Sequence, residues 1–107
     1  MKTILKYKVN TDQPQLNLTL RPGFRVVRFD YLLTEKSLYL WIEQTLRPDV
    51  PEETVAFKVA RTAEPVLDHL EYISTALDPM GSGEWHLYYQ SEQYPEITSL
   101  KPISIAA

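Results

Sequence analysis

The sequence predicts an all-β fold, a small antiparallel β-sandwich or open barrel of six to seven strands with room for one short helix. Three observations lead to this prediction. Apolar and polar residues alternate with a period of two, which is typical of strands that bury one face. The eight prolines lie between the apolar runs, where they interrupt no sheet. Turn residues recur roughly every 8–12 residues, as in sandwiches and barrels.

The first two strands are predicted over residues 3–9 and 15–20. In the first strand, apolar residues alternate with two lysines, which should point outward. In the second strand, leucines occupy every other position. Segments 10–14 and 21–23 contain the asparagine, aspartate, proline and glycine that are typical of turns, so they should connect these strands to their neighbours.

A longer run of β-branched and aromatic residues over 24–33 predicts the third strand. Both of its faces carry apolar side chains, so we expect it to lie in the centre of a sheet. Arg25 and Arg28 interrupt the run. Because successive side chains in a strand alternate, residues three apart point to opposite faces unless a β-bulge intervenes.

A hairpin is predicted where a polar turn at 34–37 leads into a strand over 38–42. In that strand three aliphatic residues face one way, while Tyr39 and Trp41 face the other. The aliphatic side should therefore be buried, and the aromatic side should lie on the opposite surface of the sheet.

Three further strands are predicted over 54–60, 71–76 and 84–90, each bounded by turn or loop residues. Segment 44–53 contains two prolines and should be a loop. Segment 66–70 is short enough to be one helical turn or a connecting loop. The strand pattern thus accounts for most of the chain up to residue 90.

The chain divides into a single small β domain over residues 1–90 and a C-terminal tail over residues 91–107. The tail has two prolines and isolated apolar residues without a clear period, so it could add an edge strand or act as an oligomerisation arm. A domain of this size with exposed edge strands gains buried area by pairing. We therefore expect a homo-oligomer to which the tail contributes.

Charge and composition exclude several classes of function. With 11 basic and 14 acidic residues the net charge is -3, which argues against general nucleic-acid binding. No apolar run reaches the roughly 20 residues of a membrane span, and the N-terminus lacks a signal-peptide core, so we expect a cytoplasmic protein with no membrane contact. The absence of cysteine excludes disulfides and thiolate chemistry.

The two parts of the chain carry opposite charge. Residues 1–47 hold eight basic and four acidic side chains, whereas residues 48–107 hold three and ten. Either the two parts lie side by side and neutralise each other, or a basic face near Arg21, Arg25 and Arg28 meets an anionic partner.

Exposed aromatic residues are the first candidates for binding. Tyr39, Trp41 and Tyr88 lie on strand faces opposite the aliphatic rows, so they could form an aromatic platform. Such side chains anchor protein interfaces and also stack on nucleic-acid bases. The alternative is that most of the aromatic residues fill the core of a small sheet, where large rings bury much area.

Arg61 and Thr62 are candidates because they lie in an irregular corner, where functional side chains often project. A guanidinium beside a hydroxyl could bind a phosphate or carboxylate. The alternative is an ion pair between Arg61 and one of the many acidic residues in the second part of the chain.

Catalytic and metal-binding motifs are absent from the sequence: it has no phosphate-binding glycine loop, nucleophile elbow or metal-spaced histidine pair. We therefore predict no cofactor and no metal. His69 and His86 each have carboxylates nearby in the sequence, namely Asp68, Glu71 and Glu84. They could form an acid–base site only if the fold brings them together.

Dispersed residues along the chain match a known pattern: Lys6-Tyr7, Leu20-Arg21-Pro22-Gly23, Leu40-Trp41, Pro51-Glu52-Glu53, Leu70–Thr75 and Trp85-His86-Leu87-Tyr88. In order and spacing they resemble a family of small uncharacterised proteins encoded by bacteriophages and prophages, over residues 2–90. The family corner Gly-Thr-Gly-His-Pro-(Ile/Val) is kept here at Thr62, Pro65 and Val66. The resemblance implies a small accessory protein in a bacterial cytoplasm, and implies no activity.

Three functions are compatible with these observations. The first is a non-enzymatic phage or prophage accessory protein that binds a host protein, for example in countering host defence. The second is an oligomeric sponge that sequesters a small anionic ligand, a nucleotide-type signal molecule. The third is a small hydrolase that uses a histidine and a carboxylate. The candidate binding residues are Arg25, Arg28, Tyr39, Trp41, Arg61, Thr62, His86 and Tyr88.

Overall fold

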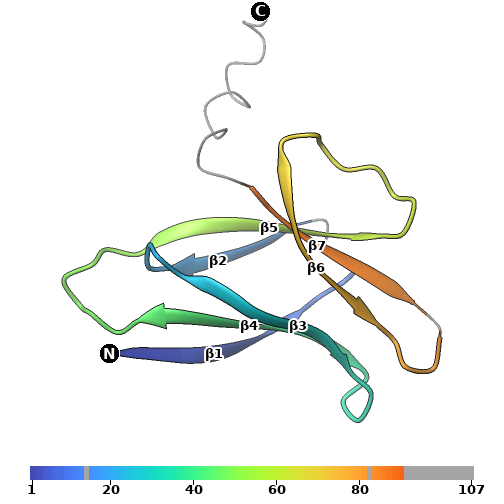
Figure 1. The fold of residues 1–107 in the computed structure, drawn as a ribbon, viewed down its shortest axis with the longest axis horizontal. Helices are drawn as coiled ribbons and strands as arrows, with labels where there is room; N and C mark the ends of the chain where they lie inside the picture. Colours follow the sequence, from blue (N-terminus) through green and yellow to red (C-terminus); the bar gives the residue numbers. More distant parts are fainter. Residues whose placement is uncertain (14, 82, 91–107) are drawn as a thin grey trace, which may run out of the picture.

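The computed structural model describes residues 1–13, 15–81 and 83–90, and within them the chain forms seven antiparallel strands and no helix (Figure 1). The all-β prediction is confirmed; of segment 66–70, residues 66–69 form a loop with a turn, and Leu70 begins the sixth strand. The predicted tail, 91–107, lies outside the described residues. The strands are β1 (Lys2–Val9), β2 (Leu16–Leu20), β3 (Arg25–Leu32), β4 (Ser37–Thr45), β5 (Glu53–Arg61), β6 (Leu70–Leu77) and β7 (Glu84–Gln90).

The strands form two sheets. Sheet A has the order β1-β4-β3, and sheet B has the order β2-β5-β7-β6. The predicted hairpin from β3 to β4 is present, with Leu32 opposite Ser37 next to the turn. Edge strands β3 and β6 contact each other and connect the two layers along one side.

The central position expected for β3 is wrong, because β4 occupies the centre of sheet A and β3 is an edge strand. A β-bulge between Val26 and Arg28 explains the error. The extra residue, Val27, shifts the alternation, so Val26 and Phe29 both face the core although they are three apart. A run that reads as apolar on both faces therefore directs most of its apolar side chains to one face.

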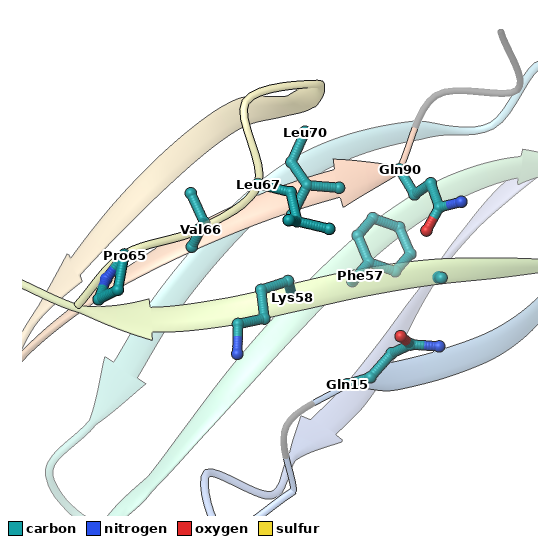
Figure 2. Close-up of a pocket in the computed structure, with 9 residues that line it drawn as sticks. Gln15, Phe57, Lys58, Pro65, Val66, Leu67, Leu70 and Gln90 are labelled. Carbon is teal, nitrogen blue, oxygen red and sulfur yellow. The ribbon is translucent and has the colours of Figure 1, made fainter. Parts of the chain in front are cut away.

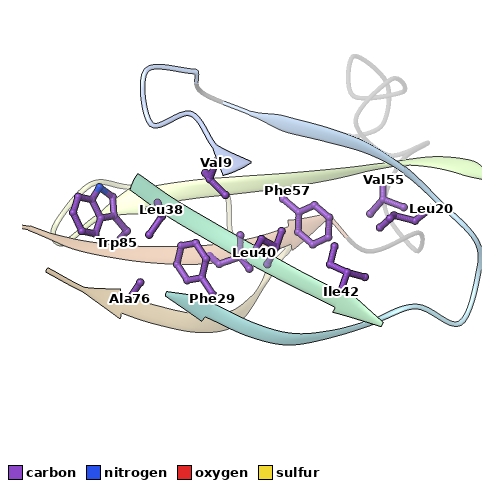
Figure 3. Close-up of a cluster of buried hydrophobic side chains, with 11 residues drawn as sticks. Val9, Leu20, Phe29, Leu38, Leu40, Ile42, Val55, Phe57, Ala76 and Trp85 are labelled. Atoms are coloured by element: carbon purple, nitrogen blue, oxygen red, sulfur yellow. The ribbon is translucent and has the colours of Figure 1, made fainter. Parts of the chain in front are cut away.

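The hydrophobic core lies between the two sheets (Figure 3). Sheet A contributes one aliphatic row from β4, together with side chains from β1 and β3, and sheet B contributes the facing side chains of its four strands. Leu20, Leu40, Ile42 and Leu87 are fully buried. The complete core is Val9, Leu20, Phe29, Leu38, Leu40, Ile42, Val55, Phe57, Ala76, Trp85 and Leu87.

Gln44 continues the inward row of β4 and is the polar end of the core, with 6% of its surface exposed. Its Oε1 accepts a hydrogen bond from the backbone N–H of Arg21 at 3.1 Å. Its Nε2 donates to the Tyr7 hydroxyl at 3.1 Å. Because a buried amide without partners would cost free energy, these bonds fix β1, β4 and the end of β2 relative to one another.

Truncation of Leu40 should destabilise the protein strongly, because it removes buried methyl groups and leaves a cavity between the sheets. We expect Leu40→Ala to lower the free energy of unfolding by about 2–5 kcal/mol in urea denaturation. Leu33→Ala is the control, since Leu33 is 43% exposed, and it should change stability by about 0.5 kcal/mol or less. Equal losses in both variants would contradict the placement of the core.

Candidate functional site

The outer face of sheet A brings basic and aromatic side chains together. Trp41 in the central strand lies directly between Lys6 of β1 and Arg28 of β3 in the ladder. Two residues along β4, Tyr39 lies between Lys8 and Asp30 in the next row. The alternation that buries Leu38, Leu40 and Ile42 thus places the two aromatic rings on the opposite side of the same strand.

Arg25 and Arg28 lie on the same face of sheet A, whereas their spacing predicts opposite faces for a strand without a bulge. The bulge that rephases the core residues of β3 also rephases the arginines. Arg25 is opposite Glu43 and Arg28 is opposite Trp41, and these two partners are two residues apart on β4. Arg28 therefore lies beside Trp41, and Arg25 lies one row further along the same face, against Glu43.

Cations lie over both aromatic rings. The Lys6 ammonium is 4.4 Å from the centre of the Tyr39 ring, and the Arg28 guanidinium is 5.0 Å from the centre of the Trp41 ring. The two rings are themselves 6.2 Å apart. Contacts of this length attract through the negative faces of the rings and hold long side chains flat on the sheet.

Acidic side chains are interleaved with the cations. The Tyr39 hydroxyl donates to Glu35 at 2.5 Å, and the Lys6 ammonium lies 3.5 Å from the same carboxylate. The hydrogen bond from Tyr39, together with the charge of Lys6, lowers the pKa of Glu35, and the same hydrogen bond raises the pKa of Tyr39. Arg28 pairs with Asp30 at 2.7 Å and Arg25 with Glu43 at 3.3 Å.

This surface is named here the basic aromatic face. Its aromatic residues are Tyr39 and Trp41, its basic residues are Lys2, Lys6, Lys8, Arg25 and Arg28, and its acidic residues are Asp30, Glu35 and Glu43. Five basic and three acidic side chains leave a positive excess on a protein whose net charge is -3. The face is thus a local exception to the overall charge.

Tyr88 does not join Tyr39 and Trp41, so the predicted three-membered aromatic platform is wrong. Tyr88 lies in β7 of sheet B, where it pairs with Lys58 and Tyr72 across the neighbouring strands. Its ring meets that of Tyr72 edge-on at 5.8 Å. The alternation of each strand was predictable, but the sheet to which the strand belongs was not.

His86 and Thr62 do come together, on the outer side of sheet B. The Thr62 hydroxyl is 2.8 Å from His86 Nε2 and donates to Glu84 at 2.5 Å. The other ring nitrogen, Nδ1, is 2.9 Å from the Thr75 hydroxyl. Both ring nitrogens of His86 therefore lie within hydrogen-bond distance of threonine hydroxyls, and the Thr62 hydroxyl connects the ring to Glu84.

Arg61 is the last residue of β5, where the chain enters the corner, and its guanidinium is 5.7 Å from the centre of the Trp85 ring. The corner is closed by Glu64, whose carboxylate accepts the backbone N–H of Arg61 at 2.9 Å. This hydrogen bond lowers the pKa of Glu64, and Lys58 at 3.5 Å lowers it further. Arg61 is thus separated from the basic aromatic face, and with Trp85 it lines a cavity of about 200 Å³.

Lys6 is the functional candidate that the sequence analysis missed. The outward direction of the lysines in the first strand was expected, but their aromatic partners lie more than thirty residues away in the chain, in β4. No local sequence pattern predicts that β1 pairs with β4. The excess of basic residues over residues 1–47 was the one feature of the sequence that pointed to a basic surface in this part of the chain.

The residues that the structure describes contain neither a metal-binding cluster nor a membrane-spanning helix. Among them, no group of three or more His, Asp or Glu side chains could hold a metal ion. Over the same residues, no helix has the length and apolarity needed to cross a bilayer.

Protonation of Glu64 should weaken the corner. Its folded-state pKa is below its usual value, so the stabilisation is present above the unfolded-state pKa near 4.5 and is lost as the pH falls through the folded value. We therefore expect Glu64→Gln to unfold at a midpoint that depends less on pH between about pH 6 and 3 in urea titrations. Glu71→Gln controls for loss of a carboxylate elsewhere, and an unchanged slope in Glu64→Gln would refute the role of this hydrogen bond.

A family model matches most of the chain. The model of a domain of unknown function, DUF7352, matches residues 1–98. Comparison with curated proteins and with solved structures gives no match. The matched range covers all seven strands and most of the 107 residues. The chain therefore belongs to the DUF7352 family.

Proposed function

We propose that this protein is a non-enzymatic binding protein, and that it binds an acidic protein surface through the basic aromatic face. The observation that carries the proposal is the position of Trp41 between Lys6 and Arg28 on the surface of sheet A. The resemblance to phage and prophage proteins suggests that the partner is a bacterial host protein, and a role in countering host defence fits that setting.

The residue types of this face are those that anchor protein interfaces. Tryptophan, tyrosine and arginine are enriched among the residues that contribute most to binding free energy. Here a half-buried Trp41 and Tyr39 form the centre, with Arg25 and Arg28 on one side and Lys6 on the other. A partner that covers the rings would also desolvate the cations, which strengthens their attraction to acidic groups.

The interleaved acidic residues favour a protein over a nucleic acid as the partner. Asp30, Glu35 and Glu43 lie among the cations, where they would repel a continuous phosphate backbone. A protein surface can match a mixed pattern residue by residue, which supports specific recognition and fast association. The positive excess of the face then selects a partner with acidic character.

The two alternative functions receive less support. A nucleotide sponge would use Arg25 and Arg28 to bind phosphate, but each of these arginines is already paired with a carboxylate, Glu43 or Asp30, which would compete with the phosphate. Arg61 lies apart from them, at the end of β5 beside Trp85. A hydrolase would need a histidine nitrogen that can take a substrate proton. In His86 both ring nitrogens are engaged by threonine hydroxyls of the protein itself.

Charge reversal on both sides of Trp41 should weaken partner binding. We expect the double variant Lys6→Glu, Arg28→Glu to lose about tenfold or more in affinity, because each glutamate would face acidic groups of the partner. The partner is first captured from a bacterial host lysate with the folded protein as bait. Affinity is then measured with the purified partner by titration calorimetry.

Arg47→Glu is the matched control, since Arg47 is an exposed, ion-paired arginine outside the face. Circular dichroism should show that all variants keep the fold. Equal affinity in the double variant and the control would refute the proposal. Tight binding of a single-stranded oligonucleotide by the wild type, lost in the double variant, would replace the protein partner with a nucleic acid.

A further inference from the structure

A second surface feature lies on the opposite side of the protein from the basic aromatic face. An apolar groove of about 510 Å³ runs between β5 and the segment that leads into β6. Figure 2 shows Pro65, Val66, Leu67 and Leu70 along one side of it, with Gln90 at the end of β7. The remaining lining residues are Gln15, Ala56, Phe57 and Lys58.

The groove leaves a large apolar side chain in water. Leu67 is 63% exposed. Its apolar neighbours in the groove cover it on one side only. Exposed apolar surface arranged in a groove is typical of a docking site for another segment of chain.

The position of Gln90 indicates what this segment is. Gln90 is the last residue of β7 and lines the groove, so the chain enters residues 91–107 at the groove itself. The DUF7352 match continues to residue 98, eight residues beyond β7, which places residues 91–98 within the family domain. That stretch contains Tyr94, Pro95 and Ile97, whose apolar side chains could fill an apolar groove.

We propose that residues 91–98 of the same chain dock into this groove. Seven or eight residues span up to about 25 Å, which is enough to cross the groove from Gln90. Direct tethering makes the docking intramolecular and raises the effective concentration of the segment far above that of a free partner. Glu92 and Glu96 complement the charge of Lys58 on the groove wall.

The proposal can be tested with one engineered label, because the chain has no cysteine. A nitroxide attached to Ser99→Cys in the full-length protein should reduce the amide NMR signals of Lys58, Val66 and Leu67. In the background of Leu67→Asp these losses should disappear. Leu77→Asp, at a leucine 56% exposed on β6 outside the groove, should leave them unchanged.

A mixing experiment identifies whose segment binds. Protein that carries the nitroxide but no ¹⁵N is mixed with ¹⁵N protein that carries no nitroxide. Docking within one chain predicts no loss of amide signal in this mixture. Loss in the mixture would show that the groove binds the segment of a second copy, and would overturn the proposal. It would equally be overturned if the groove signals kept their intensity in the labelled protein, or if Leu67→Asp lost as much signal as the Leu77→Asp control.

Discussion

The alternation of β4 is the constraint on which the rest of the structure depends. A strand has two faces, and in β4 one face supplies Leu38, Leu40 and Ile42 to the centre of the core while the other supplies Tyr39 and Trp41 to the surface. A shift of the β4 register by one residue would bury Tyr39 and Trp41 and expose the three aliphatic residues. The core and the candidate binding surface are therefore fixed by the same strand register.

The β-bulge at Val27 supplies the second half of the arrangement. It directs Val26 and Phe29 toward the core while it places Arg25 and Arg28 on the same outer face as the aromatic pair. The ion pairs of these arginines are largely exposed, and such pairs contribute about 0–1 kcal/mol to stability. The fold hardly depends on these charges, which is consistent with a role in binding and makes charge-reversal variants interpretable.

The elements of the fold were predictable because their signals are local. Alternation, prolines and turn residues defined the seven strands and the hairpin between β3 and β4 to within a few residues. The contacts between distant strands carry no such signal. Neither Lys6 over Tyr39 nor Thr62 beside His86 is visible in the sequence, since each depends on which strands pair. The bulge, a single extra residue, explains why β3 reads as a central strand and why Arg25 and Arg28 share a face despite their spacing of three.

The two tryptophans provide the most direct test of the central claim, since each has one indole N–H signal in an NMR spectrum. Trp41 lies on the basic aromatic face, whereas Trp85 is buried beside Tyr31 at 5.2 Å between the sheets. When the purified partner is added to ¹⁵N-labelled protein, the indole signal of Trp41 should shift or broaden while that of Trp85 stays in place. A shift of Trp85 with an unchanged Trp41 would show that the protein binds its partner through a different surface.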